Sequence, residues 1–235
     1  MSKNCLIIGA SGGIGSEIAK KIAEENYNLF LVGRNKKKLL KLKKEIEEKN
    51  KLNRIELGIV DLTDDKSIKK LIKNIRKKFQ TIDVLINTAG LFLVKSLQNS
   101  SIEEFDKCFK INVRSVFIFS KEFSKDMKKK KWGRIVNLGS SSAYSGFKNG
   151  TIYCSTKHSL LGLSRSLFTE LKENGIRTYC ISPSSTQTKM GKISNDQNFE
   201  TFLNPIEIAK YVVFLISFDN ELVSEEIRLN RIKME

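Results

Sequence analysis

The sequence opens on a strand-like apolar run that passes directly into a glycine-rich turn and then a helix. Residues 4–9 read NCLIIG, and apolar side chains recur every four positions over residues 14–22. Glycines permit a tight turn, and the free N–H groups at the start of the helix can bind a pyrophosphate. This pattern predicts a dinucleotide-binding α/β fold, with a first set of cofactor-binding residues at Gly9, Ser11, Gly13, Ile14 and Gly15.

The rest of the chain continues to alternate between strand-like and helix-like segments. The expected strands cover residues 28–33, 55–60, 82–86, 134–138, 176–181 and 227–232. The expected helices lie between them, the longest at residues 102–125 and 153–173. Short connections and regular alternation predict a doubly wound, Rossmann-type parallel sheet of about seven strands with helices on both faces. A chain of 235 residues suits a single domain, residues 1–235.

Charge and cysteine content limit the possible partners. The 42 Lys and Arg against 26 Asp and Glu give a net charge of +16, but the lysines fall mainly on amphipathic helices and no nucleic-acid motif accompanies them. We therefore expect no nucleic-acid partner. No apolar run has the length of about 18 residues that a membrane span needs. The four scattered cysteines predict neither a metal site nor a disulfide framework, and they favour a cytoplasmic protein.

The ends of the next strands indicate which dinucleotide binds. An acid commonly closes the second strand in NAD sites, whereas Gly33 and Arg34 stand there in this chain. Arginine suits a 2′-phosphate, so the sequence favours NADP, although Arg34 could also be a solvent-facing loop residue. Small side chains after the fourth strand would let a cofactor lie against the backbone. The further cofactor-binding candidates at these strand ends are Asp61, Leu62, Asn87, Ala89 and Gly90.

A serine, a tyrosine and a lysine provide the candidate chemistry. Ser140 follows a buried strand, Tyr153 comes thirteen residues later, and Lys157 lies four residues further on. Residues four apart share one face of a helix, so Tyr153 and Lys157 can point into one site. A phenol ionises near pH 10, and a neighbouring cation would lower that pKa toward neutrality. A tyrosine and a lysine four apart also occur by chance, as does a buried asparagine such as Asn112.

Taken in order, these motifs resemble the short-chain dehydrogenase/reductase family over essentially the whole chain. The family's glycine-rich turn matches Gly9, Gly13 and Gly15, and its N-N-A-G motif matches residues 87–90, with Thr88 replacing the second Asn. Two departures stand out. Ser184 replaces a glycine after the sixth strand, and the C-terminus lacks the common Gly-Gly ending. The residues that match the family's adenine contact and its catalytic Asn, Ser, Tyr and Lys are Asp61, Asn112, Ser140, Tyr153 and Lys157.

The resemblance implies an NADPH-dependent hydride transfer between the cofactor and a carbonyl or alcohol. Ser140 would orient the carbonyl oxygen, Tyr153 would protonate it, Lys157 would lower the tyrosine pKa and bind the ribose, and Asn112 would hold a water. Reduction of a 3-oxoacyl thioester is the first specific form. The alternatives are a small-molecule carbonyl reductase or hydroxy-acid dehydrogenase, and a non-enzymatic NADP sensor. The resemblance also adds three cofactor-binding candidates: Pro183, Thr186 and Thr188.

Three further expectations concern partners and substrate. In the resembling 3-oxoacyl reductases, basic residues at two helix ends dock an acyl carrier protein. Here residues 128–131 are four lysines, but Asn174 stands at the second position, and a lysine run can also merely complement the helix dipole. The apolar run at residues 116–119 predicts a homodimer or homotetramer through the helices containing Phe119 and Leu167. Residues 184–204 have the weak periodicity of a substrate lid.

Overall fold

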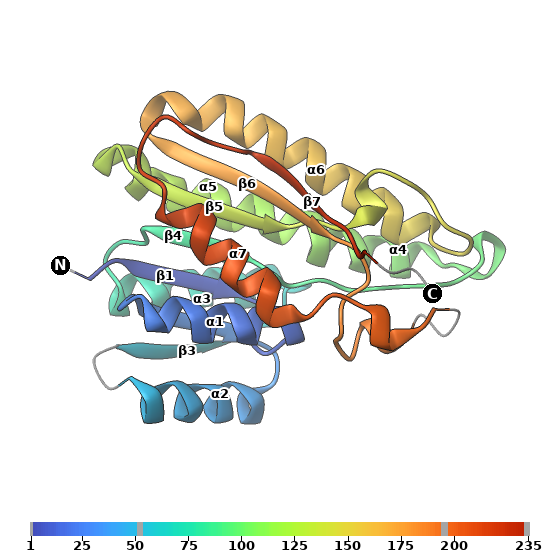
Figure 1. Ribbon diagram of the computed structural model, residues 1–235, viewed down its shortest axis with the longest axis horizontal. Helices are drawn as coiled ribbons and strands as arrows, with labels where there is room; N and C mark the ends of the chain where they lie inside the picture. The colour runs from blue at the N-terminus through green and yellow to red at the C-terminus, as the bar shows by residue number, and fades with distance from the viewer. Residues whose placement is uncertain (1, 51–53, 194–196, 233–235) are drawn as a thin grey trace.

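A computed structural model describes residues 2–50, 54–193 and 197–232 (Figure 1). Seven strands form one sheet in the order β3-β2-β1-β4-β5-β6-β7, and each pair of neighbours runs parallel. This confirms the predicted Rossmann-type doubly wound sheet. The strands are β1 (Asn4–Ile8), β2 (Asn28–Gly33), β3 (Ile55–Ile59), β4 (Val84–Asn87), β5 (Gly133–Leu138), β6 (Ile176–Pro183) and β7 (Glu226–Leu229).

Helices cover both faces of the sheet. One hydrophobic core lies between the sheet and α1, α2 and α7, and a second lies between the sheet and α3, α5 and α6. In Figure 1, α1 and α7 lie in front of the sheet and α3 and α5 behind it. Alternate residues of each buried strand therefore point into different cores. The helices are α1 (Gly13–Glu24), α2 (Lys36–Lys49), α3 (Asp65–Lys78), α4 (Ile102–Phe109), α5 (Ser115–Lys130), α6 (Thr151–Leu171) and α7 (Pro205–Ser217).

The strand order reverses between β1 and β4, and the loops after these two strands pack together. Gly9, directly after β1, has a φ of +95°. A Cβ built on Gly9 would lie 2.5 Å from the backbone nitrogen of Ala89, so only glycine allows this approach. Open α/β sheets bind ligands at such a reversal, outside the carboxyl ends of the strands. The fold therefore places a crevice at the glycine-rich turn.

The segment expected to form one helix at residues 102–125 is divided in the structure. A π-helical turn, Lys110–Arg114, separates α4 from α5, and α5 continues to Lys130. Asn112 lies in this turn, and π-turns are common at functional sites. The apolar run is covered on one side only within the chain, because Phe119 is fully buried while Phe117 is 48% exposed. The predicted oligomer remains a prediction.

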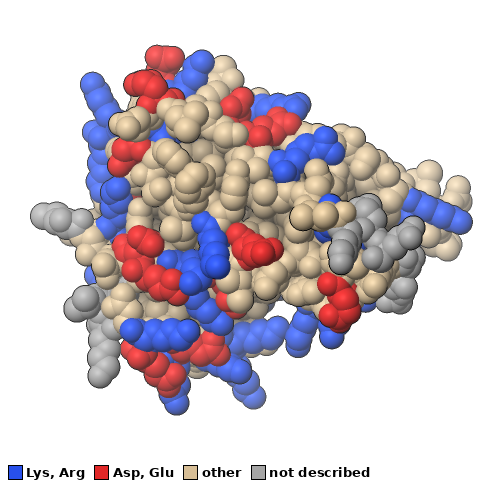
Figure 2. Space-filling view, in the orientation of Figure 1, with Lys and Arg blue, Asp and Glu red and all other residues tan. Residues whose placement is uncertain are grey.

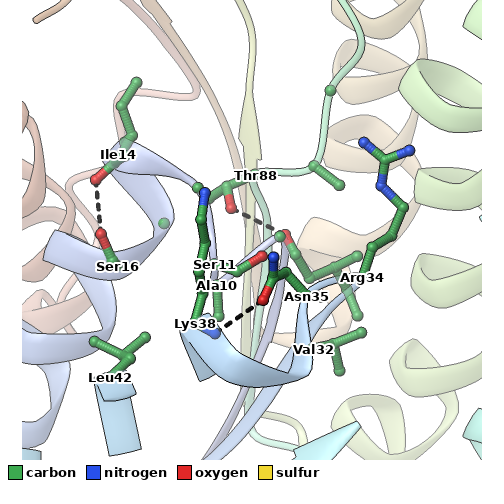
Figure 3. Close-up of a pocket in the computed structure, with 18 of the residues that line it drawn as sticks. Ala10, Ser11, Ile14, Ser16, Val32, Arg34, Asn35, Lys38, Leu42 and Thr88 are labelled. Atoms are coloured by element: carbon green, nitrogen blue, oxygen red, sulfur yellow. Dashed lines mark hydrogen bonds between the residues drawn. The ribbon is translucent and has the colours of Figure 1, made fainter. Parts of the chain in front are cut away.

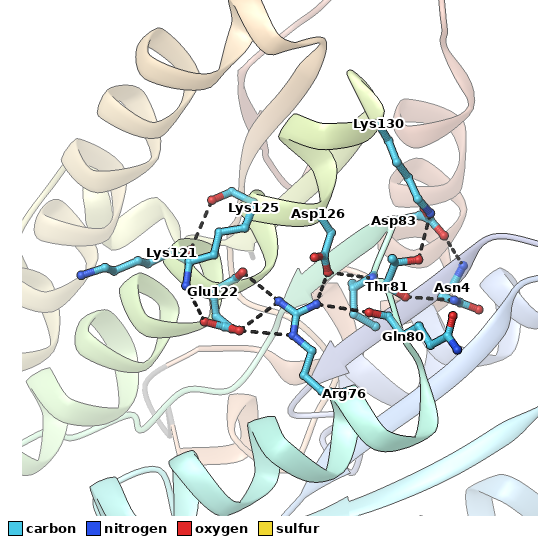
Figure 4. A network of polar contacts seen from close by, with 12 residues as sticks. Asn4, Arg76, Gln80, Thr81, Asp83, Lys121, Glu122, Lys125, Asp126 and Lys130 are labelled. Carbon is cyan, nitrogen blue, oxygen red and sulfur yellow. Dashed lines mark hydrogen bonds and ion pairs between the residues drawn. The ribbon is translucent and has the colours of Figure 1, made fainter.

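An ion-pair network fixes α3 and α5 at the amino-terminal edge of the sheet, opposite the crevice (Figure 4). Arg76 on α3 donates to Glu122 at 2.9 Å and also to Asp126, both on α5. Lys130, near the end of α5, lies 2.5 Å from Asp83, a buried carboxylate that also accepts a hydrogen bond from the backbone of Asn4. One of the four lysines at residues 128–131 therefore has a structural partner.

Surface charge is interspersed on the face that Figure 2 shows. Along α2, lysines pair with glutamates one helical turn away, as Lys41 does with Glu45 and Lys44 with Glu48. Such exposed pairs each contribute little to stability, but they break up the basic surface. In the part of the chain that the structure describes, no helix has the length and apolarity to cross a membrane.

Candidate functional site

A cavity of about 970 Å³ lies at the carboxyl ends of β1, β2 and β4. Figure 3 shows its wall at the glycine-rich turn and the start of α2. The cavity brings together most of the predicted cofactor-binding residues from five separate segments. Those that line it are Gly9, Ser11, Gly13, Ile14, Gly15, Arg34, Leu62, Ala89, Gly90 and Thr188.

The glycines of the turn are required by neighbouring segments. A Cβ on Gly13 would lie 2.6 Å from Cγ2 of Thr188, and one on Gly15 would lie 2.6 Å from the hydroxyl oxygen of Thr88. The Thr88 hydroxyl in turn donates to the Ile8 carbonyl at 2.9 Å, which holds the loop after β4 against β1. The turn thus presents bare backbone and the amino terminus of α1 to the cavity, as a pyrophosphate site requires.

Positive side chains line the cavity wall beside the glycine-rich turn. Arg34, Lys38 and Lys41 all face it, and Arg34 and Lys38 extend from either side of the Asn35 turn (Figure 3). Asn35 caps α2 by accepting a hydrogen bond from the Lys38 backbone at 3.0 Å, which fixes that turn. The sequence analysis did not single out Lys38, because many lysines on this helix face solvent. The indication in the sequence was that Lys38 follows Arg34 by four residues, the spacing at which side chains can lie on the same side of a helix.

Asp61 does not line this cavity, whereas its neighbour Leu62 does. The Asp61 carboxylate accepts hydrogen bonds from the backbone and the hydroxyl of Thr63, at 2.9 and 2.7 Å. These bonds, followed by the nearby charge of Arg34, hold the Asp61 pKa below its ordinary value. Asp61 is therefore an ionised side chain beside the cavity rather than in its wall.

Ser140, Tyr153 and Lys157 come together at the end of β5. Ser140 directly follows Gly139 at the end of that strand, and α6 carries the other two residues. The Ser140 hydroxyl lies close enough to the Tyr153 hydroxyl to influence its ionisation. The Lys157 ammonium donates to the Leu138 carbonyl at 2.8 Å. Tyr153 and Lys157 are only 7% and 5% exposed, so both groups lie in a dry environment.

The expected lowering of the Tyr153 pKa by Lys157 was wrong for this structure. Burial raises the pKa of Tyr153 to about 12, and the nearby Ser140 hydroxyl offsets only part of that effect. Burial also lowers the pKa of Lys157 to about 8. The physical reason is that Lys157 points to the Leu138 carbonyl, and its nitrogen lies 5.8 Å from the centre of the Tyr153 ring. Desolvation therefore outweighs charge attraction here.

Asn112 connects three segments of the site. Its amide oxygen accepts from the Leu91 backbone N–H at 2.7 Å, and its amide nitrogen donates to the Leu91 carbonyl at 3.0 Å. The same nitrogen donates to the Thr156 hydroxyl at 2.9 Å, and Thr156 donates to the Tyr153 carbonyl at 2.7 Å. Thr156 is fully buried. The sequence analysis missed Thr156, because a threonine inside a helix carries no distinctive signal.

The remaining predicted residues lie beside the cavity or behind it. Asn87 points into the interior, where its amide nitrogen donates to Asn137 at 2.8 Å. Pro183 ends β6, and the Thr186 hydroxyl donates to the Ser184 carbonyl at 3.0 Å. Ser184 continues the strand direction, because its N–H donates to the Leu229 carbonyl at 2.8 Å and its φ is not positive. The replacement of the family glycine therefore causes no backbone strain at this position.

The dinucleotide-shaped cavity and the Ser140–Tyr153–Lys157 cluster meet at two shared residues. Leu91 and Leu138 line the cavity, and their backbone groups bind Asn112 and Lys157. A ligand lying along the cavity would thus end beside the cluster. Residues 194–196, inside the segment predicted as a lid, fall outside the described residues, and the lid remains a prediction.

Comparison with known proteins agrees with this geometry. A sequence profile described as short chain dehydrogenase matches residues 3–198. The 3-oxoacyl-(acyl-carrier-protein) reductase FabG of Buchnera aphidicola subsp. Schizaphis graminum is 33% identical over 225 residues, which cover 92% of this chain and 90% of that protein. An uncharacterized oxidoreductase of Staphylococcus saprophyticus is 28% identical over 214 residues, 91% of each chain.

Solved structures extend the similarity to the fold as a whole. The alcohol dehydrogenase of the archaeon Thermococcus sibiricus, complexed with 5-hydroxy-NADP, is 28% identical with a TM-score of 0.88, over 99% of this chain and 97% of that one. ElxO with NADP bound is 27% identical with a TM-score of 0.85, over 98% of both chains. The sheet order, the glycine-rich turn and these similarities place the chain in one family of enzymes. The protein belongs to the short-chain dehydrogenases and is an oxidoreductase.

Proposed function

We propose that this protein is an NADPH-dependent reductase that transfers a hydride to a carbonyl group, with Ser140, Tyr153, Lys157 and Asn112 as its working residues. The observation that carries the proposal is the convergence of Ser140, Tyr153 and Lys157 at the end of β5, beside a cavity lined by a glycine-rich turn. The NADP-bound relatives support the choice of cofactor. We also propose that the protein works in the cytoplasm.

The residues present fit a nicotinamide dinucleotide with a 2′-phosphate. Gly13 and Gly15 leave backbone N–H groups open to a pyrophosphate, and a Cβ at either position would meet Thr188 or Thr88. Arg34 and Lys38 provide positive charge beside the glycine-rich turn, at the start of α2, where a 2′-phosphate would bind. When bound, the cofactor supplies the hydride or accepts it.

The protonation states favour carbonyl reduction over alcohol oxidation at neutral pH. With a pKa raised to about 12, Tyr153 keeps its proton and is ready to donate it to a developing alkoxide. Ser140 donates to the same oxygen and positions the carbonyl. Lys157, with a pKa of about 8, still carries its charge in most molecules at pH 7, which favours the phenolate left after proton transfer. Asn112 hydrogen-bonds both to the loop at Leu91 and to the helix at Thr156, which fixes their positions relative to each other.

The first candidate substrate is a 3-oxoacyl thioester on an acyl carrier protein, because FabG is among the relatives. Docking of this acidic carrier would depend on Lys129 and Lys131, which are exposed. Lys130 is paired with Asp83 at 2.5 Å, and the Lys128 nitrogen lies 3.9 Å from Glu170. The cationic surface is thus smaller than the sequence predicts. This observation favours the second candidate, a small-molecule carbonyl reductase.

A turnover assay with NADPH and a panel of ketones and 3-oxoacyl thioesters tests the proposal. We expect NADPH oxidation with at least one uncharged ketone. Absence of turnover across the panel, with NADPH bound, would contradict the reductase assignment.

The carrier protein is tested with the double variant Lys129→Glu, Lys131→Glu, which leaves the Lys130–Asp83 pair in place. A matched control, Lys70→Glu with Lys73→Glu, makes the same charge change on α3. If the carrier docks here, only the first variant slows reduction of the carrier-bound substrate, and the effect fades at high salt. Equal slowing of a soluble thioester would exclude this docking mode.

We propose that the protein forms a homodimer through α5 and α6, and that a homotetramer requires pairing of the C-terminal end as well. The support is the exposure of Phe117, a large apolar side chain on α5 that is 48% exposed. Apolar exposure on a helix face commonly marks an interface.

A further inference from the structure

Two phenylalanine side chains pack against Tyr153, the proposed proton donor. The Phe92 ring meets the Tyr153 ring edge to face, with centroids 4.7 Å apart and an angle of 86° between the planes. The Phe147 ring lies 6.4 Å from Tyr153 and 6.1 Å from Phe92. Phe92 comes from the loop after β4, and Phe147 from the loop before α6. Three rings from separate segments therefore form one apolar cluster around the catalytic hydroxyl.

The backbone holds the two loops in place. The Lys95 N–H donates to the Asn149 carbonyl at 2.7 Å, which ties one loop to the other. A Cβ on Gly150 would lie 2.5 Å from the Phe147 ring, so the ring packs directly on the residue that precedes α6. The Gly150 N–H also donates to the Phe147 carbonyl at 3.0 Å. Phe147 thus has a defined position although its side chain is 41% exposed.

The arrangement determines how a substrate can approach. A carbonyl oxygen that reaches the Tyr153 hydroxyl brings the group next to the carbonyl against the exposed sides of Phe92 and Phe147. The two rings are too close to admit a flat group between them, since carbon contacts of about 3.5 Å on each side need a separation of about 7 Å. The group next to the carbonyl must therefore pack on the outer surface of the rings.

Charge is disfavoured at this surface. The Lys95 ammonium is bound to the Glu104 carboxylate at 2.8 and 2.9 Å, so it does not offer a partner to an anion on the rings. A carboxylate placed against Phe92 and Phe147 would lose water without gaining a hydrogen bond there. Lys148, which is exposed beside Phe147, is the cation in these loops that an anionic substrate would have to use.

We propose that Phe92 and Phe147 form an apolar wall that selects carbonyl substrates bearing a bulky, uncharged group next to the reactive carbon. This inference rests on the proposed reductase function and adds the class of substrate to it. An apolar contact of this kind changes the ratio of kcat/KM between two substrates by about 10- to 200-fold for each apolar group that packs on it.

The test compares kcat/KM at saturating NADPH for two matched pairs of methyl ketones. The first pair is phenylacetone and acetone, which differ by the apolar ring. The second pair is acetoacetamide and acetoacetate, which have equal numbers of heavy atoms and differ by the charge. We expect the ring-bearing and the uncharged ketone each to be preferred by about tenfold or more. Phe147→Ala should bring the phenylacetone-to-acetone ratio close to one, and Phe92→Leu should lower the same ratio independently.

Lys148→Gln is the matched control, because it changes the charge of the same loop and leaves both rings in place. It should leave the phenylacetone-to-acetone preference unchanged and should not improve the turnover of acetoacetate. The apolar wall is overturned if acetoacetate is turned over as well as its amide or better, or if the phenylacetone preference depends on Lys148. The reductase function then still stands. If NADPH binds but none of the four ketones is reduced, the result contradicts the proposed reductase function, and with it the substrate selection by Phe92 and Phe147.

Discussion

The buried ammonium of Lys157 should make the protein less stable than a variant without it. Lys157 is 5% exposed, and burial lowers its pKa from 10.5 to about 8. At about 1.4 kcal/mol per pH unit, this difference corresponds to about 3 kcal/mol that favours the unfolded state while the side chain is charged in both states. Replacing Lys157 with Met keeps an unbranched side chain and removes the charge.

At pH 7 we expect the Lys157→Met variant to have a free energy of unfolding about 1 to 2 kcal/mol above that of the wild type. The gain is smaller than 3 kcal/mol because the Leu138 carbonyl loses its hydrogen bond from the ammonium at 2.8 Å, a loss of about 1 to 2 kcal/mol. The same variant should lose turnover. Lys157 would then support activity while it lowers the free energy of unfolding, as active-site residues often do.

The pH dependence distinguishes this explanation from simple packing. Between pH 8 and 10.5 the unfolded chain binds the Lys157 proton and the folded protein releases it, so wild-type stability from this group rises with pH in that window. The variant lacks this rise, which amounts to about 2.5 kcal/mol by pH 10. The difference in stability should therefore vanish and then reverse, so that the wild type is the more stable protein at pH 10. Tyr153 titrates in both proteins, so its contribution cancels when the two free energies of unfolding are compared.

Guanidinium unfolding followed by the fluorescence of the single tryptophan, Trp132, measures both free energies at pH 7 and pH 10. Lys73→Met, on the exposed side of α3, is the control for removing a charge without burial. A Lys157→Met protein that is less stable than wild type at pH 7 would refute the reasoning. A stability difference that stays constant from pH 7 to pH 10 would refute it equally.

Three other predictions concern the cofactor, the site and the assembly. Arg34→Ala should raise the Kd for NADPH by about 10- to 100-fold and leave that for NADH unchanged, because only the 2′-phosphate needs its charge; equal losses in a fluorescence titration would contradict this. Thr156→Val should lower kcat and shift its pH profile, with Thr156→Ser restoring both, whereas a purely structural role would lower stability alone. Phe117→Glu should convert the dimer to a 26.8 kDa monomer in sedimentation, and a wild-type monomer at micromolar concentration would contradict the interface.

The alternation of apolar runs was sufficient to predict the fold. Buried parallel strands such as residues 28–33 read as continuous apolar runs, and Gly9 with its neighbours marks a turn where backbone must approach backbone. Helix ends were less predictable. In α5 the lysine run gives no stop signal, and the helix ends only where Lys131 adopts a left-handed conformation, with a φ of 50°.

What the sequence did not reveal depends on tertiary contacts. The π-turn at Asn112 coincides with the pair of hydrogen bonds to Leu91, a residue 21 positions away. The direction in which the Tyr153 pKa shifts depends on burial, and the spacing of residues in the sequence does not reveal burial. The pairing of Lys130 with Asp83 likewise joins residues 47 positions apart, so a run of four equivalent lysines could not show which were free.

The assignment of Tyr153 as the proton donor is tested most directly by the turnover number of Tyr153→Phe at saturating NADPH, with the best substrate of the panel. The variant keeps the ring that packs against Phe92 and loses only the hydroxyl that lies near Ser140. We predict that kcat falls about 100- to 10,000-fold while NADPH binds as in the wild type, measured by nicotinamide fluorescence. A variant that binds NADPH normally and keeps more than about a hundredth of the wild-type kcat would contradict general acid catalysis by Tyr153.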